Sequence, residues 1–299
     1  MLIAMIILSV VFMFALPLVL ALILTRRYQA TWRTIGVGVL AYLVTQSVML
    51  LLVEGIQAWL QNQLTAEVVG LPLTTVLLYA LAWLACIFTV LSLWIGQRYL
   101  KSEADSWIGA LTLGVGFGSA ESLIMGIQFA YNFYPYVGAA LFGVQSLGLS
   151  ASDAATLTSS MASFLSTPWY YPLTYILDRM SYVSVYLAVA VVVWQALTKR
   201  KWSWLWLVGG MVWLIIVQTL NNVVATISVN SYWTELFLFT VMLISLEFMY
   251  WYKVNVLDRR ARDAEMSEAE AVINVDPAKD NETVEPTSGA RPRKARKTK

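Results

Sequence analysis

The stretch WIGALTLGVGFGSAESLIMGIQFA, residues 107–130, decides the class of fold. It is mostly apolar, and Glu121 is its only charged residue. About 20 apolar residues are enough for a helix to cross the hydrocarbon core of a bilayer. A carboxylate inside such a helix is costly unless it is protonated or paired, so Glu121 marks a candidate functional site.

The rest of the chain has the same character and predicts an all-α, polytopic membrane protein. Of its 299 residues 59% are hydrophobic, and they include 13 Trp and 15 Tyr, a composition that excludes a soluble globular protein. Seven segments are long and apolar enough to span a bilayer: Leu2–Leu24, Ile35–Leu60, Thr74–Ile95, Trp107–Ala130, Tyr170–Leu197, Ser203–Val224 and Tyr232–Tyr252.

Basic residues predict how these segments are oriented. Residues 1–257 contain ten Lys or Arg, and nine of them follow the first, third, fifth and seventh segments: Arg26, Arg27, Arg33, Arg98, Lys101, Lys199, Arg200, Lys201 and Lys253. The positive-inside rule then places the N-terminus outside and the C-terminus in the cytoplasm. We therefore expect a multi-pass protein of the plasma membrane.

Residues 1–257 form the predicted transmembrane domain, and residues 258–299 are interpreted as a disordered cytoplasmic tail. The tail is rich in charge and contains no aromatic residue. Its basic end, Arg291–Lys299, is either a solvated segment or one that attracts anionic lipid of the inner leaflet. Nucleic acid is not an expected partner, because no aromatic residue interleaves the basic ones.

The longest loop predicted outside the membrane is Tyr131–Trp169, which begins with an aromatic set suited to the interface. Ser152 and Asp153 predict the cap of a short helix that runs to about Leu165. We expect this helix to lie on the membrane surface or to cover the mouth of a cavity.

Three polar side chains are predicted to lie at a common depth, because a helix rises about 1.5 Å per residue. Glu121 lies about 21 Å from the inner end of its segment and Gln218 about 22 Å from the inner end of its own. Asp178 lies about 12 Å from the outer end of its segment, in a core of about 30 Å. Asn222 is one turn further out than Gln218. Lipid cannot satisfy such groups, so we expect a shared polar pocket that opens outward.

Other polar or charged positions on these segments lead to predictions about an ion pair, a polar stripe and a solvated carboxylate. Arg179 is expected to pair with Glu121 from another helix, since its neighbour Asp178 points about 100° away around the helix. Gln46, Glu54 and Gln57 form a polar stripe, with Glu54 near the mouth of the pocket. Glu235, near the outer end of the last segment, is expected to be solvated.

The glycines before Glu121 predict close packing between helices. Gly114 and Gly118 form a GxxxG pattern, in which small residues let two helix backbones approach each other. A dinucleotide-binding fingerprint is excluded, because no strand precedes the glycines and they lie inside a membrane segment.

The run from Gly114 to Glu121, GVGFGSAE, resembles the GxGxGxxE motif of the YhfC-type intramembrane proteases, which are similar to the PrsW and CAAX-protease group. The resemblance extends to the seven-helix layout and to an acidic–Arg pair on the following helix, here Asp178 and Arg179. It implies a peptidase in which Glu121 acts as general base on a water. Asp178 stands where the family has Glu. Gln218 and Asn222 stand on the helix where a histidine with an Asn or Asp is expected, but the chain has no histidine.

Several chemistries remain open for this set of residues. Glu121 can act as base while Arg179, Asn222 or Gln218 stabilises the oxyanion. Alternatively, Glu121 and Asp178 share a proton, as the two carboxylates of aspartic proteases do. A metal held by carboxylates alone would be a hard ion such as Mg²⁺ rather than zinc.

The predicted function is the hydrolysis of membrane-embedded peptides, with Glu121, Asp178, Arg179, Gln218 and Asn222 as candidate catalytic residues. One alternative is a non-catalytic relative that binds a lipid or a membrane peptide in the same pocket. The other is a small transporter or ion-coupled protein that uses the cluster of Glu121, Asp178 and Arg179. The sequence does not identify a cofactor.

Overall fold

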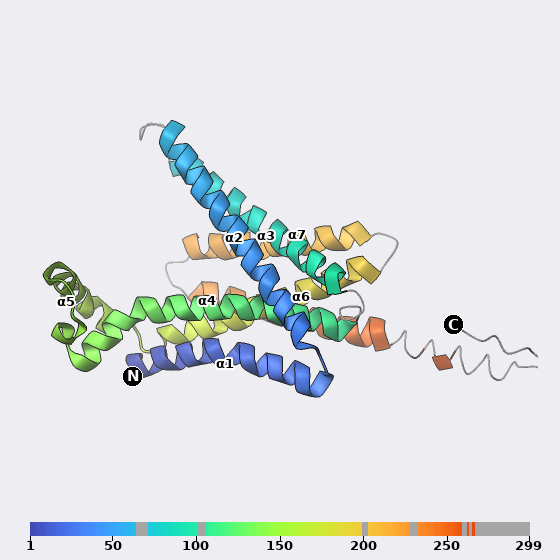
Figure 1. The fold of residues 1–299 in the computed structure, drawn as a ribbon, viewed down its shortest axis with the longest axis horizontal. Coiled ribbons are helices and arrows are strands. Elements are labelled where there is room, and N and C mark those ends of the chain that lie inside the picture. The colour runs from blue at the N-terminus through green and yellow to red at the C-terminus, as the bar shows by residue number, and fades with distance from the viewer. Residues whose placement is uncertain are drawn as a thin grey trace, which may run out of the picture. The chain divides into compact units, whose positions relative to one another are not determined.

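A computed structural model describes residues 1–63, 71–100, 106–198, 203–227 and 232–258, together with residues 262, 265 and 266. Within these ranges the chain is helical and contains no strand, which confirms the all-α prediction. The elements are α1 (Leu2–Tyr28), α2 (Trp32–Gln63), α3 (Leu71–Leu100), α4 (Trp107–Phe142), the 3₁₀ helix η2 (Val144–Leu147), α5 (Ala151–Ser166), α6 (Tyr171–Thr198), α7 (Ser203–Ile227), α8 (Tyr232–Tyr252) and the π-helix η3 (Lys253–Leu257) (Figure 1).

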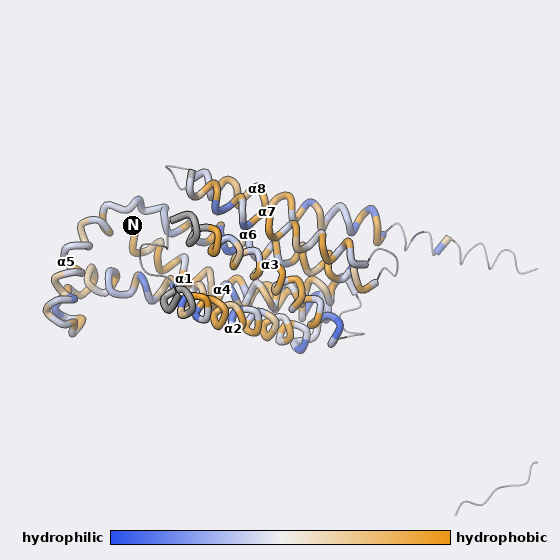
Figure 2. Tube along the Cα trace, turned by 90° about the horizontal axis from the view of Figure 1, so that it is seen from above, coloured by the Kyte–Doolittle hydropathy of each residue, from blue (hydrophilic) through white to orange (hydrophobic). Residues whose placement is uncertain are grey.

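Seven helices in the described part of the chain are long and apolar enough to cross a membrane, as predicted. They are α1 to α4 and α6 to α8, and Figure 2 shows them predominantly hydrophobic along most of their length. The side of the membrane on which each terminus lies stays a prediction. Four of the basic residues that carry it, Lys101 and the run Lys199–Lys201, lie outside the described residues.

The chain divides into two compact units, Met1–Met249 and Tyr250–Lys299. In the second unit the structure describes the end of α8, then η3, and a few residues beyond it. The predicted tail, residues 258–299, lies almost entirely outside the described residues, so its disorder and its attraction to lipid stay predictions. Every feature described below belongs to the first unit.

Helices α4 and α6 form the centre of the first unit. In the most apolar stretch of α4, 72% of the residues are buried, and in that of α6, 67% are buried. In the corresponding stretch of α7, only 17% of the residues are buried. Helices α1, α2 and α6 all pack on α4. Most side chains in this stretch of α4, Glu121 among them, therefore face other helices and not lipid.

The glycines of α4 bring its backbone against two neighbours. A Cβ at Gly114 would lie 3.0 Å from the Ala190 Cβ of α6, and a Cβ at Gly118 would lie 3.2 Å from the Val183 Cγ2 of the same helix. A Cβ at Gly116 would collide with the Ile35 carbonyl oxygen of α2. The close packing predicted from Gly114 and Gly118 is thus confirmed. Gly116 allows an equally close approach of α2 on the opposite side of α4.

The prediction of a loop from Tyr131 onward is wrong, because α4 continues through Pro135 as far as Phe142. A proline inside a helix removes one backbone hydrogen bond and leaves one carbonyl without its usual donor. That carbonyl belongs to Tyr131, a residue exposed at the surface of the helix. The aromatic residues of this region are therefore helical.

The short helix predicted for the loop is present as α5. The chain leaves α4 at Gly143, where φ is 85°, and α5 begins after Ser150, whose Oγ accepts a hydrogen bond from the Asp153 backbone N–H. The cap is therefore Ser150 and not Ser152. Phe164 of α5 stacks on Tyr136 of α4, with 4.9 Å between ring centroids. This contact packs α5 against the part of α4 that follows Ala130.

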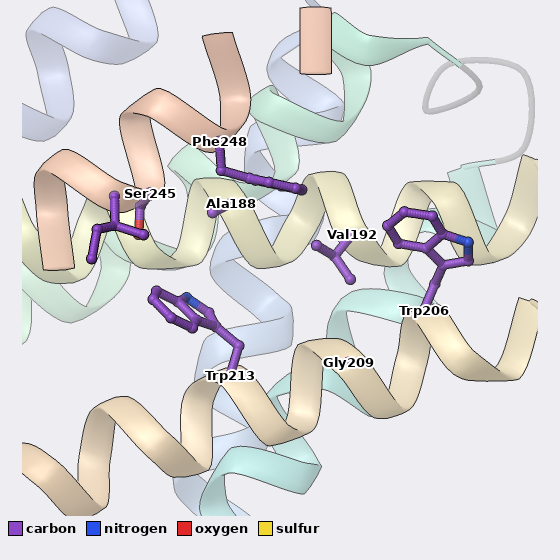
Figure 3. A pocket seen from close by; sticks show the side chains of 8 residues that line it. Ala188, Val192, Trp206, Gly209, Trp213, Ser245 and Phe248 are labelled. Carbon is purple, nitrogen blue, oxygen red and sulfur yellow. The ribbon is translucent and has the colours of Figure 1, made fainter. Parts of the chain in front are cut away.

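Helices α6, α7 and α8 together line an apolar cavity of about 270 Å³. Trp206 and Trp213 project from α7 on either side of Gly209, and Phe248 faces them from α8 (Figure 3). Ser245 lies at the α8 side of this cavity and is buried, yet its Oγ has no hydrogen-bond partner within the described part of the chain.

Substitution of Ser245 by alanine is expected to leave the free energy of unfolding unchanged or to raise it by up to about 1 kcal/mol. A buried hydroxyl without a partner carries a desolvation cost that alanine does not. Ser184→Ala is the matched control, because the Ser184 hydroxyl donates to the Met180 carbonyl at 2.8 Å. Reversible unfolding in mixed micelles measures both. A loss of stability in S245A as large as in S184A would contradict the geometry.

Candidate functional site

Glu121, Asp178 and Arg179 form one ion-pair cluster between α4 and α6. Arg179 Nη1 donates to Glu121 Oε1 at 3.0 Å, and its Nη2 donates to Asp178 Oδ2 at 3.1 Å. Glu121 and Arg179 are both 7% exposed. The predicted pairing between helices is confirmed. The expectation that Asp178 points away is wrong for the charged group, because the long arginine side chain bends back to reach its neighbour.

The packing of α4 on α6 places this cluster. Gly118 lies against Val183, and one turn further along α4 Glu121 meets Arg179, one turn back along α6. Each step forward on α4 is thus matched by a step backward on α6, as in an antiparallel pair. The absence of a side chain at Gly118 allows the backbones to approach closely, so that the Glu121 carboxylate can reach the guanidinium directly.

The second carboxylate oxygen of Glu121, Oε2, is buried and has no hydrogen-bond partner of ordinary geometry among the described residues. Tyr42 and Tyr182 lie close enough to the carboxylate to interact with it electrostatically, and Tyr186 interacts with it through its side-chain hydroxyl as well. A buried carboxylate oxygen normally accepts a hydrogen bond from the protein or from water. In this structure Oε2 is enclosed by protein atoms, so a water or a donor on a bound molecule reaches the carboxylate only after a side chain beside it moves.

A cavity of about 300 Å³ opens beside Glu121. Helices α2, α3, α4, α6 and α7 all contribute to its wall, which includes Gln46, Cys86, Thr89, Glu121, Met125, Asp178, Arg179, Tyr182, Tyr186 and Gln218. The depth count therefore placed Glu121, Asp178 and Gln218 correctly in a common pocket.

Two of the expected residues are not part of this wall. Asn222 is half-buried one turn beyond Gln218 and does not line the cavity, whereas its neighbour Asn221 donates from Nδ2 to the Tyr182 hydroxyl at 3.3 Å. Glu54 is exposed, because α2 crosses α4 obliquely and carries its far end away from the cluster (Figure 1). Of the predicted stripe on α2, Gln46 is the residue in the wall.

A second cavity of about 340 Å³ lies on the other side of Arg179. It shares Met125, Asp178 and Arg179 with the first, and its polar lining also includes Gln128, Asn132 and Tyr175. The sequence contained a signal for these residues, because Glu121, Met125, Gln128 and Asn132 follow i, i+4, i+7 and i+11 on one face of α4. The ion pair thus forms a partition between two cavities.

Glu235 is a third carboxylate near the cluster, and the expectation that it is solvated is wrong. It is half-buried, interacts with Thr174, Asp178 and Arg179, and keeps its Oε2 buried. Depth along α8 alone suggested a solvated residue, but the direction of the side chain turns it toward α6.

This geometry defines a class: a polytopic α-helical membrane protein with an acidic site buried among its helices beside a cavity. A family model described as YhfC intramembrane metalloprotease matches residues 12–243, and the chain belongs to that family, as the GxGxGxxE motif predicted. No curated protein and no solved structure matches the chain.

The residues of this chain do not fit the metal that the family description implies. The chain contains no histidine, and within the described ranges no group of three His, Cys, Asp or Glu side chains is arranged to hold a metal ion. The two carboxylates that converge are already bound by Arg179. The donor set therefore suits neither zinc nor the magnesium alternative considered from the sequence.

Proposed function

We propose that the protein is an intramembrane peptidase that hydrolyses membrane-embedded peptide segments with Glu121 as general base. One observation carries the proposal: Arg179 holds Oε1 of Glu121, and the Glu121 side chain forms part of the wall of a cavity. Family membership supports the reaction class. As the ion-pair partner of Arg179, Glu121 is a carboxylate, which is the form that a base requires.

The cluster supplies a role for each group in the reaction. A water hydrogen-bonded to the Glu121 carboxylate attacks the peptide carbonyl carbon and transfers its proton to the carboxylate. Arg179 has five N–H donors, and those not engaged by Glu121 and Asp178 can hold the developing oxyanion. Glu121 then returns the proton to the amide nitrogen as the C–N bond breaks, which yields a carboxylic acid and an amine. Asp178 keeps the guanidinium in place.

The two cavities support a peptide as the substrate. They meet at Met125, Asp178 and Arg179, so a chain lying across the ion pair has space for a side chain on each side of the cleaved bond. In the first cavity, Gln218 of α7 supplies an amide that can pair with the backbone of an unwound segment. Asn222 lies outside this wall and has no role in the proposal.

One alternative function has an observation of its own. Both converging carboxylates are already hydrogen-bonded to Arg179, and no histidine is present to assist Glu121. A non-catalytic relative that binds a membrane segment in the same cavities would keep this arrangement.

Glu121→Gln is expected to lower kcat by about 10²–10⁴-fold while KM stays nearly unchanged, because the amide cannot accept the proton from water. Glu247→Gln makes the same chemical change at an exposed position on α8 and is expected to retain full activity. The assay reconstitutes the full chain with a quenched fluorescent library of apolar helices of about 20 residues.

The outcomes separate the two functions. Undiminished cleavage by E121Q would exclude Glu121 as base. Wild-type protein that binds library members in the same vesicles without cleaving any of them would support the non-catalytic alternative. The folding of E121Q is checked by its unfolding transition.

A further inference from the structure

We propose that this chain departs from the metal dependence in its family's description: the guanidinium of Arg179 is the cation that Glu121 and Asp178 hold, and no divalent metal ion binds between them. The inference rests on the ion-pair geometry and on the donor set. It does not require that Glu121 act as a base.

The guanidinium is held from three sides. Glu121 binds Nη1 and Asp178 binds Nη2, at 3.0 and 3.1 Å. The Tyr182 ring lies beneath the group, with 5.1 Å from Arg179 Cζ to the ring centroid, within the range of a cation–π contact. The Arg179 side chain is 9% exposed, so these three groups and not solvent surround its charge.

The oxygens that face Arg179 are the ones a metal ion would need. Glu121 Oε1 and Asp178 Oδ2 both accept hydrogen bonds from the guanidinium. A divalent ion placed between them would meet a fixed positive charge in a buried environment where water screens poorly. Displacing the guanidinium would in turn leave a buried arginine without its partners, which is strongly unfavourable.

The remaining donors do not make up a metal site. Cys86 lines the same cavity and Glu235 lies near Asp178, but in the described part of the chain neither forms a metal-binding group with the two carboxylates. Gln46 and Gln218 offer only neutral amide oxygens from other walls. Zinc prefers nitrogen and sulfur ligands, and magnesium demands nearly octahedral oxygen ligands, so neither preference is met.

The test measures metal directly on the purified full chain. After incubation with Zn²⁺, Mn²⁺ or Mg²⁺ and removal of the free ion, elemental analysis is expected to show far less than one metal per chain. The thermal midpoint is expected to be the same with EDTA as with any of the three ions. Stoichiometric metal that is lost in Glu121→Gln, or a midpoint that falls with EDTA, would overturn the inference.

A variant tests the cation role of the guanidinium. Arg179→Met leaves Glu121 and Asp178 facing each other without a cation, so Mn²⁺ or Mg²⁺ at millimolar concentration is expected to raise its midpoint. Arg179→Met combined with Glu121→Gln is the matched control and is expected not to respond. A single variant that folds and ignores both ions would contradict the assigned role, and if it does not fold, the wild-type measurements decide alone. Neither arm uses proteolysis, so a failed cleavage assay leaves this result unaffected.

Discussion

Arg179→Met is expected to lower the free energy of unfolding by about 3–5 kcal/mol, the range for breaking a buried ion pair by removing one partner. The reason is that Glu121, 7% exposed, would keep its carboxylate among the helices with no positive charge to balance it. Asp178 is less affected, because its side chain is 26% exposed. Reversible unfolding of the reconstituted or micellar protein measures the change.

A triple variant makes this expectation sharper. Glu121→Gln, Asp178→Asn and Arg179→Met together remove every charge of the cluster at nearly constant volume. Replacing a whole buried ion pair is often neutral, so the triple variant is expected to recover most of the stability that R179M loses. If R179M were as stable as the wild type, the carboxylates would have access to water that the structure does not give them.

Gly38→Ala is expected to lower the free energy of unfolding by about 3 kcal/mol, near the upper end for inserting one carbon into a packed interior. A Cβ at this position would collide with the Leu113 carbonyl oxygen and lie 2.9 Å from the Gly116 Cα. Both atoms belong to the backbone of α4, so no side-chain rotation can relieve the contact. The two helices would have to separate.

Gly36→Ala is the matched control for this substitution. It makes the same change two residues earlier in α2, where nothing lies within 4 Å of the added carbon. Alanine favours a helix over glycine by up to about 1 kcal/mol, so G36A is expected to be slightly more stable than the wild type. Equal effects at the two positions would contradict the close approach of α2 to α4.

The parts of the fold that follow from local physical rules could be predicted from the sequence. Seven spans follow from apolar length, and α8 has the predicted bounds, Tyr232–Tyr252. The common depth of Glu121, Asp178 and Gln218 follows because the rise of a helix per residue is constant. The Gly114 and Gly118 contact with α6 follows because small residues permit close helix packing.

The predictions that are wrong concern side chains whose depth in the membrane follows from the sequence but whose direction around the helix does not. Counting residues gives the height of a side chain but neither the tilt of its helix nor the neighbour it faces, and this is why Asn222 and Glu235 were misplaced. The pairing of Asp178 with Arg179 was not expected because the direction of Cβ was taken to limit a side chain several bonds long. The predicted span ends at Ala130 because the aromatic residues from Tyr131 onward are typical of the membrane interface, whereas α4 continues to Phe142.

The glycine contacts between α4 and α6 have a consequence for the response of the site to its bilayer. Helices tilt when the thickness of the hydrocarbon core changes. Because Gly114 and Gly118 lock α4 onto α6, the two should tilt together and keep Glu121 on Arg179. In the most apolar stretch of α7 only 17% of the residues are buried, so we expect Gln218 to shift relative to the pair when α7 tilts. We therefore expect lipid chain length to change the width of the cavity while the ion pair stays intact.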